Sequence, residues 1–315
     1  MNDIIKGLSR KVISHKIKAK MESWLKSIDN PDLVGKMRND YIVTGGAITS
    51  MLLGEFVNDY DVYFQTPEVA LEIVSYYLGK CAGEDTTKVM KVAKINSTND
   101  GIEVYIKSAG VIRGEGDNQR DYDYFETDAN GQRLEKYLNN ETFQNKTSYG
   151  VAMITSNALS LRDDIQIITR FVGVPTEIHK NFDFIHCTNW FTHKEGLFLS
   201  SQAMESILSR QLNYGGSRYP LCSMFRLRKF IKRGWSINAG EMLKIGWDIS
   251  ELNLSDPKVL MEQTIGVDAA YFTQLLLILN NKENSTTYDR SYLFELINKV
   301  FNEPIGVGEA VAENE

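Results

Sequence analysis

The chain has 315 residues, a formal net charge of −6, 43% hydrophobic residues and 24% charged residues. This composition is typical of a globular protein with one or two domains, and the acidic balance excludes a nonspecific polycation. Three cysteines without a CxxC pair argue against a disulfide framework, and no apolar run approaches the roughly 18 residues that span a bilayer. We therefore expect a soluble, cytoplasmic protein with no membrane partner.

Residues 1–28 are predicted to form a helix, because apolar residues such as Ile13, Ile17 and Met21 recur at helical spacing. The same stretch is rich in lysine, which predicts a basic amphipathic segment over residues 1–30. Its basic face could bind nucleic acid or phosphate. We favour the alternative that the helix packs its apolar stripe on the body and leaves the lysines in solvent.

Residues 41–80 read as strand, Gly-Gly turn, helix, acidic strand and helix. An apolar strand leads into Gly45 and Gly46, and Gly54 is placed to end the short helix that follows. In the next strand, DYDVYF, alternation puts Asp59 and Asp61 on one face. Two carboxylates on an apolar strand are unfavourable unless a cation binds there, and Mg²⁺ is the expected cation because it prefers carboxylate oxygens.

Further strands are predicted in VMKVAKIN and in GIEVYIK, which contains Glu103. Ordered structure is expected again over residues 151–161 and 163–173, with a strand that begins at Asp164. A polar, acidic segment at about 110–150 reads as an insertion. One helical turn is expected at 175–180. The stretch NFDFIHC is then expected to be a short apolar strand with a single carboxylate, Asp183, whose partner would be an arginine such as Arg170 or a metal.

The C-terminal part is predicted to be a helical domain over residues 196–303, with a flexible tail at 304–315. Helices are expected near 197–212, 220–233, 239–247, 257–265, 268–281 and 288–302. On the second of these, Arg226 and Lys229 fall on a face without acidic residues. We favour a role for this face in binding triphosphate or a polynucleotide; the alternative is a solvated surface.

The stretch GGAITSMLLGEFVNDYDVYF resembles the DNA polymerase β-like nucleotidyltransferase superfamily. It is most similar to the head domains of CCA-adding enzymes and bacterial poly(A) polymerases. The residues that match the head motif in order are Gly45, Gly46, Leu52, Leu53, Gly54, Asp59 and Asp61. Thr49 and Ser50 stand where that motif has Arg-Asp. The resemblance implies an α+β fold, with a mixed-sheet nucleotidyltransferase domain over residues 31–195 followed by an all-α C-terminal domain.

The resemblance also implies a reaction: transfer of a nucleoside monophosphate from an NTP to a hydroxyl, with two Mg²⁺ ions and release of pyrophosphate. Asp59 and Asp61 would bind both metals. Asp183 is our first choice for the third carboxylate, and Glu103 is the next. The expected nucleotide-binding residues are Gly45, Gly46, Thr49, Ser50, Arg226 and Lys229.

Two classes of function follow. The first is an active nucleotidyltransferase whose acceptor is an RNA 3′ end, with a protein or a small molecule as other possibilities. The second is a catalytically retired nucleotidyltransferase fold that serves as a nucleotide- or nucleic-acid-binding module or as a structural component of an assembly. The intact Asp59 and Asp61 favour the first, whereas Ala47 after Gly-Gly and the absent Arg-Asp pair keep the second open.

Overall fold

The computed structural model describes residues 7–82, 93–98, 101–106, 149–154 and 158–254, and positions 256, 259, 263, 291, 294 and 295. Most of the predicted insertion, the predicted tail and most of the helices expected beyond residue 256 therefore lie outside the described residues. The chain divides into two compact units. Unit 1 comprises residues 1–125, 132–180 and 186–204, and unit 2 comprises residues 126–131, 181–185 and 205–315.

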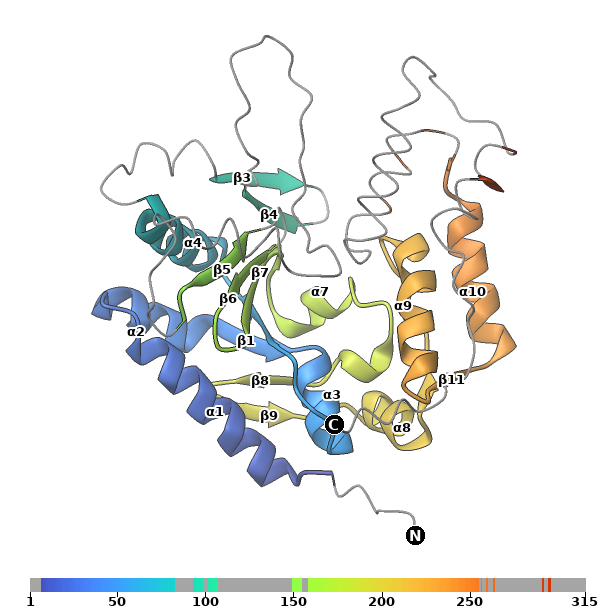
Figure 1. The fold of residues 1–315 in the computed structure, drawn as a ribbon, viewed down its shortest axis with the longest axis horizontal. Coiled ribbons are helices and arrows are strands. Elements are labelled where there is room, and N and C mark those ends of the chain that lie inside the picture. The colour runs from blue at the N-terminus through green and yellow to red at the C-terminus, as the bar shows by residue number, and fades with distance from the viewer. Residues whose placement is uncertain are drawn as a thin grey trace, which may run out of the picture. The chain divides into compact units, whose positions relative to one another are not determined.

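Unit 1 contains a seven-stranded sheet (Figure 1). Its strands, in spatial order, are β5 (Val151–Ile154), β6 (Ala158–Leu161), β7 (Ile165–Val172), β2 (Tyr60–Phe64), β1 (Tyr41–Thr44), β8 (Trp190–Thr192) and β9 (Gly196–Phe198). β2 and β7 run parallel and all other neighbours run antiparallel, so the sheet is mixed. The strands predicted in VMKVAKIN and GIEVYIK are confirmed as a separate antiparallel pair, β3 (Ala93–Thr98) and β4 (Gly101–Ile106).

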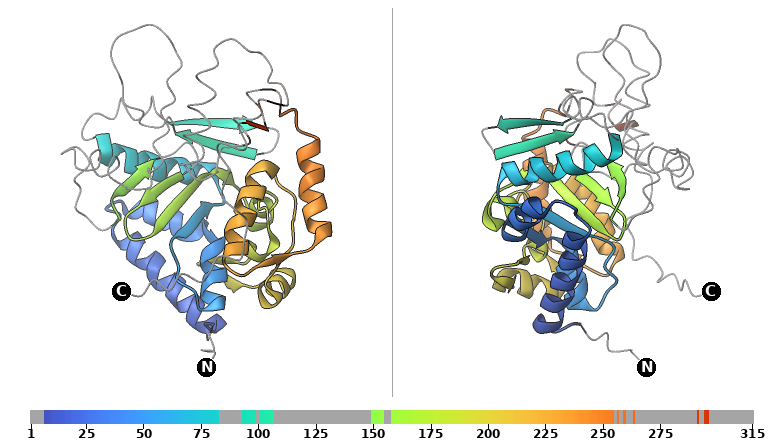
Figure 2. Two further views of the ribbon diagram at one scale, coloured as in Figure 1. Left: turned by 45° about the vertical axis from the view of Figure 1, so that its right-hand side comes forward. Right: turned by 90° about the vertical axis from the view of Figure 1, so that its left-hand side faces the viewer.

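The helices of unit 1 contribute apolar residues to one core with one face of the sheet, and Figure 2 gives two further views of this arrangement. They are α1 (Arg10–Lys26), α2 (Pro31–Asp40), α3 (Gly46–Leu53) and α4 (Pro67–Ala82). The short α7 (Pro175–His179) also belongs to unit 1. Along each strand, residues that face the core alternate with residues on the opposite face of the sheet. Val43 and Val62 are register partners on the core face, and so are Ile167 and Leu159. The strands therefore leave their second face for polar residues such as Asp61.

The predicted amphipathic helix is confirmed in α1, which begins after the N-cap Ser9. Its buried residues are Ile13, Ile17, Met21, Trp24 and Leu25. Two of its cationic side chains contact other parts of unit 1. The Arg10 guanidinium donates to the carbonyl of Leu197, and the Lys20 Nζ atom lies 3.7 Å from Oδ2 of Asp164. Helix α2, which begins at Pro31 after the N-cap Asn30, was not predicted.

The described part of unit 2 is mainly helical, with α9 (Pro220–Lys232) and α10 (Ala239–Ser250), as predicted for residues 220–233 and 239–247. The helix predicted near 197–212 is confirmed in the middle of that range, but its predicted ends are wrong. That stretch contains the end of β9, helix α8 (Ser201–Ser209) and β10 (Gln211–Leu212), because Arg210 has φ +49° and ends the helix. β10 pairs in parallel with β11 (Ser236–Ile237), so the expectation of an all-α C-terminal part is corrected.

The strand predicted over residues 181–187 is also wrong. Asp183 lies in a bend, Phe184 forms an isolated bridge with Tyr214, and Ile185–Cys187 form the 3₁₀ helix η2. Within unit 2, Phe184 packs edge-on against Tyr214 and Phe230, so its apolar side chain is buried without a sheet. Among the described residues, no helix has the length and apolarity needed to cross a bilayer.

Candidate functional site

The candidate site begins where β1 turns into α3. The chain turns at Gly45, which is buried and has φ +90°, a conformation that residues with side chains rarely adopt. Gly46 is exposed and starts α3, and the N-cap Gly45 provides no side-chain hydrogen bond. The first turn of α3 therefore presents backbone N–H groups without a side-chain cap, an arrangement that favours anions.

Asp61 lies directly beside this turn. It is the register partner of Thr44, and a Cβ built on Gly45 would lie 2.7 Å from its Oδ2 atom. Only glycine therefore lets this carboxylate approach the backbone of the turn so closely. Asp59 is exposed and directly precedes β2, which begins at Tyr60, so the expectation that it shares a strand face with Asp61 stays a prediction.

A second segment, residues 186–189, crosses this turn, and we call it the strap. Three of its backbone carbonyls accept hydrogen bonds from the β1–α3 turn. The Gly45 N–H donates to Cys187 at 3.1 Å, and the hydroxyls of Thr44 and Thr49 donate at 2.8 Å to Asn189 and His186. The strap therefore fixes the backbone of the turn from the β8 side, and it was not predicted.

His179, at the end of α7, contacts the same turn. Its Nε2 atom lies 2.8 Å from the hydroxyl oxygen of Thr44. Because the single hydroxyl proton of Thr44 is donated to Asn189, His179 must carry its proton on Nε2 and donate to Thr44. Burial lowers the pKa of His179 to about 4, so the ring is neutral at pH 7 and its role at this position is to hold Thr44.

A row of polar residues extends from the turn across the non-core face of the sheet. Thr44, Asp61, Gln166 and Ser160 are successive register partners on β1, β2, β7 and β6. We call these four residues the polar row. The Gln166 amide donates to Ser160 at 3.3 Å, which fixes the orientation of this side chain next to Asp61. The residue beside Asp61 on β7 is thus an amide instead of a carboxylate.

The two residues that replace the Arg-Asp pair lie in α3 and are buried. Thr49 is 3% exposed and its hydroxyl is bonded to the strap, and Ser50 is 6% exposed. Gly46, in contrast, has open space where a Cβ would be added. Of the four nucleotide-binding residues predicted in this part of the chain, Gly46 is therefore the one with the most room for a ligand.

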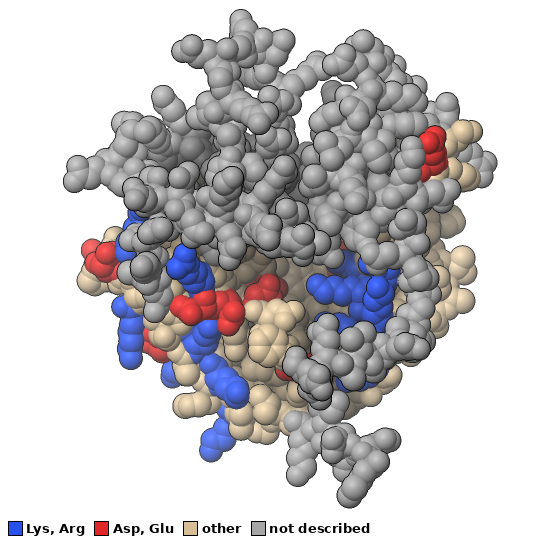
Figure 3. All heavy atoms as spheres, viewed as in Figure 1, with Lys and Arg blue, Asp and Glu red and all other residues tan. Residues whose placement is uncertain are grey.

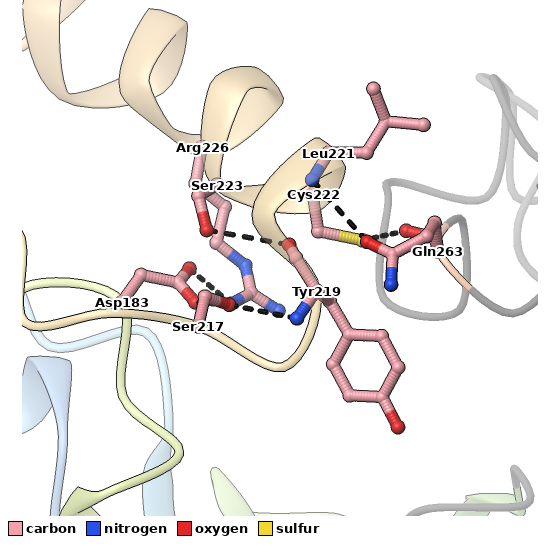
Figure 4. A network of polar contacts seen from close by, with 8 residues as sticks. All are labelled: Asp183, Ser217, Tyr219, Leu221, Cys222, Ser223, Arg226 and Gln263. Carbon is pink, nitrogen blue, oxygen red and sulfur yellow. Dashed lines mark hydrogen bonds and ion pairs between the residues drawn. The ribbon is translucent and has the colours of Figure 1, made fainter. Parts of the chain in front are cut away.

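Asp183 lies in unit 2 and is 5% exposed (Figure 4). Its Oδ1 accepts a hydrogen bond from Ser217 at 2.8 Å, and its Oδ2 forms an ion pair with Arg226 of α9. The partner is therefore Arg226, where the sequence had suggested Arg170 or a metal. This network accounts for the buried carboxylate of Asp183 within unit 2.

Lys229 is exposed on α9, and Figure 3 shows Lys and Arg side chains gathered where Figure 1 draws this helix. The side chain of Arg226 is 44% exposed, although it pairs with Asp183. The predicted basic face of α9 is therefore available to solvent at both positions.

Within the part of the chain that the structure describes, no group of three or more His, Cys, Asp or Glu residues is arranged to hold a metal ion. Asp59 and Asp61 nevertheless supply the carboxylate oxygens that Mg²⁺ prefers, and the space at Gly46 could admit phosphate and water ligands. The donor set fits a Mg²⁺ ion shared with a bound phosphate. Among the described residues, it does not form a site built from protein ligands alone.

Similar solved structures are CCA-adding enzymes. The Thermotoga maritima enzyme complexed with tRNA has 10% identity and a TM-score of 0.38, and the match covers 89% of this chain and 69% of that one. The Bacillus stearothermophilus enzyme in complex with CTP has 12% identity and a TM-score of 0.36, and the match covers 93% of this chain and 55% of that one. A further complex of a CCA-adding enzyme with CTP has 12% identity and a TM-score of 0.37, with 90% and 61% covered.

No curated protein matches the chain. Residues 15–210, which include the β1–α3 turn, Asp61, the strap and the polar row, match the Gabija anti-defense 2 family. The chain belongs to the Gabija anti-defense 2 protein family.

Proposed function

We propose that this protein is a Mg²⁺-dependent nucleotidyltransferase that uses the β1–α3 turn and Asp61 as its reaction centre. The observation that carries the proposal is the close approach of Asp61 to Gly45, next to the uncapped N-terminus of α3. This arrangement places a carboxylate, which attracts a cation, beside backbone N–H groups, which attract an anion. An NTP with its Mg²⁺ ion carries both kinds of charge, a cation and anionic phosphates.

In this proposal the N–H groups of α3 hold the phosphates, and Gly46 leaves the room that the phosphates need. Asp59 and Asp61 hold Mg²⁺, which when bound would polarise the phosphoryl oxygens and neutralise developing charge. The strap and His179 keep the turn in place through Thr44 and Gly45, so the anion-binding groups are oriented before the substrate arrives.

The acceptor hydroxyl requires a third group that lowers its pKa or orients it. From the sequence, Asp183 is the first choice, but in the structure Arg226 and Ser217 already bind its two oxygens. Glu103 lies on β4 in unit 1, together with Asp59 and Asp61. The partners of Asp183 make Glu103 the stronger of the two, and the comparison of both variants below decides between them.

The name of the family indicates the general class of acceptor for the transferred nucleotide. The description of the family names an anti-defense role against Gabija. We infer that transfer of a nucleotide to a component of Gabija, or to RNA, would serve that role.

A second candidate function is nucleotide binding without transfer. One residue of the polar row favours this second function. Gln166 is the register partner of Asp61 on β7, at a position where a carboxylate would supply a further ligand for a pair of metal ions. A site of this kind would bind NTP and Mg²⁺ through α3 and Asp61 and would release no pyrophosphate.

One experiment separates the two functions. The full chain is incubated with each labelled NTP and Mg²⁺, alone, with total RNA and with purified Gabija components, and pyrophosphate release and label transfer are measured. Transfer that disappears in Asp59→Asn and Asp61→Asn supports the transferase. Nucleotide binding without turnover under all these conditions supports the binding module, and absence of both contradicts the whole proposal.

A further inference from the structure

Two aromatic residues lie at the edge of the sheet in unit 1. Trp190 on β8 and Phe198 on β9 stack with ring centroids 5.0 Å apart and an interplanar angle of 20°. Phe198 is 48% exposed, so part of its ring surface is accessible to a ligand. We call these two residues the aromatic pair.

The aromatic pair continues the line of the polar row. Trp190 is the register partner of both Thr44 and Phe198, so it follows Thr44 on the face that carries Asp61. With neighbouring strands about 4.8 Å apart, Trp190 lies about 10 Å from Asp61 and Phe198 about 14 Å from it. These distances can be spanned by one or two nucleotides. A nucleotide with its phosphate at the β1–α3 turn could therefore place a base at the aromatic pair.

The backbone that carries the pair is fixed on both sides. The Arg10 guanidinium donates to the Leu197 carbonyl through Nε at 3.2 Å and Nη2 at 2.7 Å. The side chain of Asn189 accepts a hydrogen bond from the Ser200 N–H at 2.9 Å, and its backbone carbonyl accepts the hydroxyl of Thr44. The pair therefore presents an ordered ring surface that is connected to the turn through the strap.

We propose that the aromatic pair is a stacking platform for a nucleobase. The inference rests on the proposed function, since it takes the phosphate position from the β1–α3 turn. The side chain of Phe198 has no hydrogen-bonding atoms, so this ring recognises the flat face of a base and does not discriminate among bases by hydrogen bonding. The base belongs either to the bound nucleotide or to a single-stranded polynucleotide, and the two sources share the same chemistry.

The test uses variants of Phe198, because its partial exposure makes it tolerant of substitution. Phe198→Leu keeps apolar bulk and removes the ring, and Phe198→Trp restores a ring. The probes are ATP, a six-nucleotide oligoadenylate and inorganic tripolyphosphate, which lacks a base. Dissociation constants are measured by calorimetry, in Mg²⁺ and in EDTA, on full chains whose Tm has been compared with that of the original protein.

We expect Phe198→Leu to raise the Kd of at least one base-containing probe by about 5- to 100-fold, with tripolyphosphate unchanged and with Phe198→Trp restoring affinity. An effect confined to ATP identifies the base of the nucleotide, and an effect confined to the oligonucleotide identifies the acceptor strand. Unchanged Kd values for both base-containing probes, or an equal loss of tripolyphosphate binding, would overturn the platform.

The outcomes for the platform and for the transferase are distinguishable. Binding that depends on Phe198 in EDTA, in a protein that shows no transfer, would retain the platform and reject the transferase. The opposite outcome is transfer that depends on Asp61 but has the same KM values for the nucleotide and for the polynucleotide in Phe198→Leu. It would retain the transferase and reject the platform.

Discussion

The side chain of Asp61 occupies space that a Cβ on Gly45 would need: the distance from that Cβ to Oδ2 would be 2.7 Å. Gly45 also has φ +90°, so two independent requirements select glycine at this position. Gly46, the next residue, meets neither requirement, since it is exposed and a Cβ there would contact nothing within 4 Å. The two adjacent glycines therefore differ: the local structure requires glycine at position 45, whereas it leaves open space for a side chain at position 46.

The first prediction concerns this pair of glycines. Gly45→Ala should lower the free energy of unfolding by about 2 kcal/mol or more, because the backbone conformation and the approach of Asp61 both oppose a Cβ. Gly46→Ala should leave the Tm unchanged or slightly raised and should weaken NTP binding. Thermal unfolding with and without nucleotide measures both effects. If Gly46→Ala binds NTP as the original protein does, the phosphates do not lie at α3.

The second prediction concerns Thr49. Thr49→Val keeps the shape of the side chain but leaves the carbonyl of His186 without its hydroxyl donor, so it should destabilise the protein by about 1–3 kcal/mol. Because the hydroxyl is already used by the strap, the Kd for NTP should change little. Ser50→Ala is the matched control in the same helix. A large increase in Kd for Thr49→Val without a loss of stability would instead show that Thr49 binds the triphosphate directly.

The third prediction concerns pH. The pKa of His179 in the folded protein is about 4, below its ordinary value of 6.5, so the unfolded chain binds the proton more strongly. The contribution of neutral His179 to the free energy of unfolding is therefore fully present above pH 6.5. It is lost as the pH falls from 6.5 to 4, and the loss is at most about 3 kcal/mol. His179→Gln, which can still donate to Thr44 and does not titrate, should have a shallower slope in this range. Equal slopes for both proteins in chemical denaturation would contradict the assignment.

The fourth prediction separates the two candidates for the third carboxylate. If Glu103 holds the acceptor, Glu103→Gln should abolish Mg²⁺-dependent turnover and leave NTP binding intact. Asp183→Asn should then change stability more than turnover, because Asp183 is bound by Arg226 and Ser217. Turnover and Tm are measured for both variants. Loss of turnover in Asp183→Asn at an unchanged Tm would restore Asp183 as the third carboxylate.

The fifth prediction concerns the basic face of α9. Arg226→Ala should destabilise the protein by about 1–3 kcal/mol, less than for a fully buried pair, because its guanidinium is partly exposed. Lys229→Ala should leave the stability unchanged, since Lys229 is exposed. Lys229→Ala is therefore the cleaner test of phosphate binding: we expect a higher Kd for NTP or RNA at low salt. An unchanged Kd there would exclude this face from the binding site.

The parts that could be predicted from sequence are those that depend on local patterns. The turn at Gly45, the helix that follows it and the acidic strand at Asp61 all rest on residue periodicity and on glycine, and the structure contains each of them. The strap could not be predicted, because it binds the turn through backbone carbonyls, which every residue has. The partner of Asp183 lies more than forty residues away on α9, and sequence spacing gives no information about such contacts.

The strap also affects when the site can be assembled during synthesis. The residues that bind to it, from Thr44 to Thr49, leave the ribosome far earlier than their acceptors at positions 186–189, and the chain enters unit 2 at 181–185 in between. A nascent chain that ends before residue 181 contains Asp59, Asp61, Gly45 and Gly46. It lacks the carbonyls that accept hydrogen bonds from the Gly45 N–H and the Thr49 hydroxyl. The β1–α3 turn is therefore completed late, only after the return of the chain from unit 2 has been synthesised.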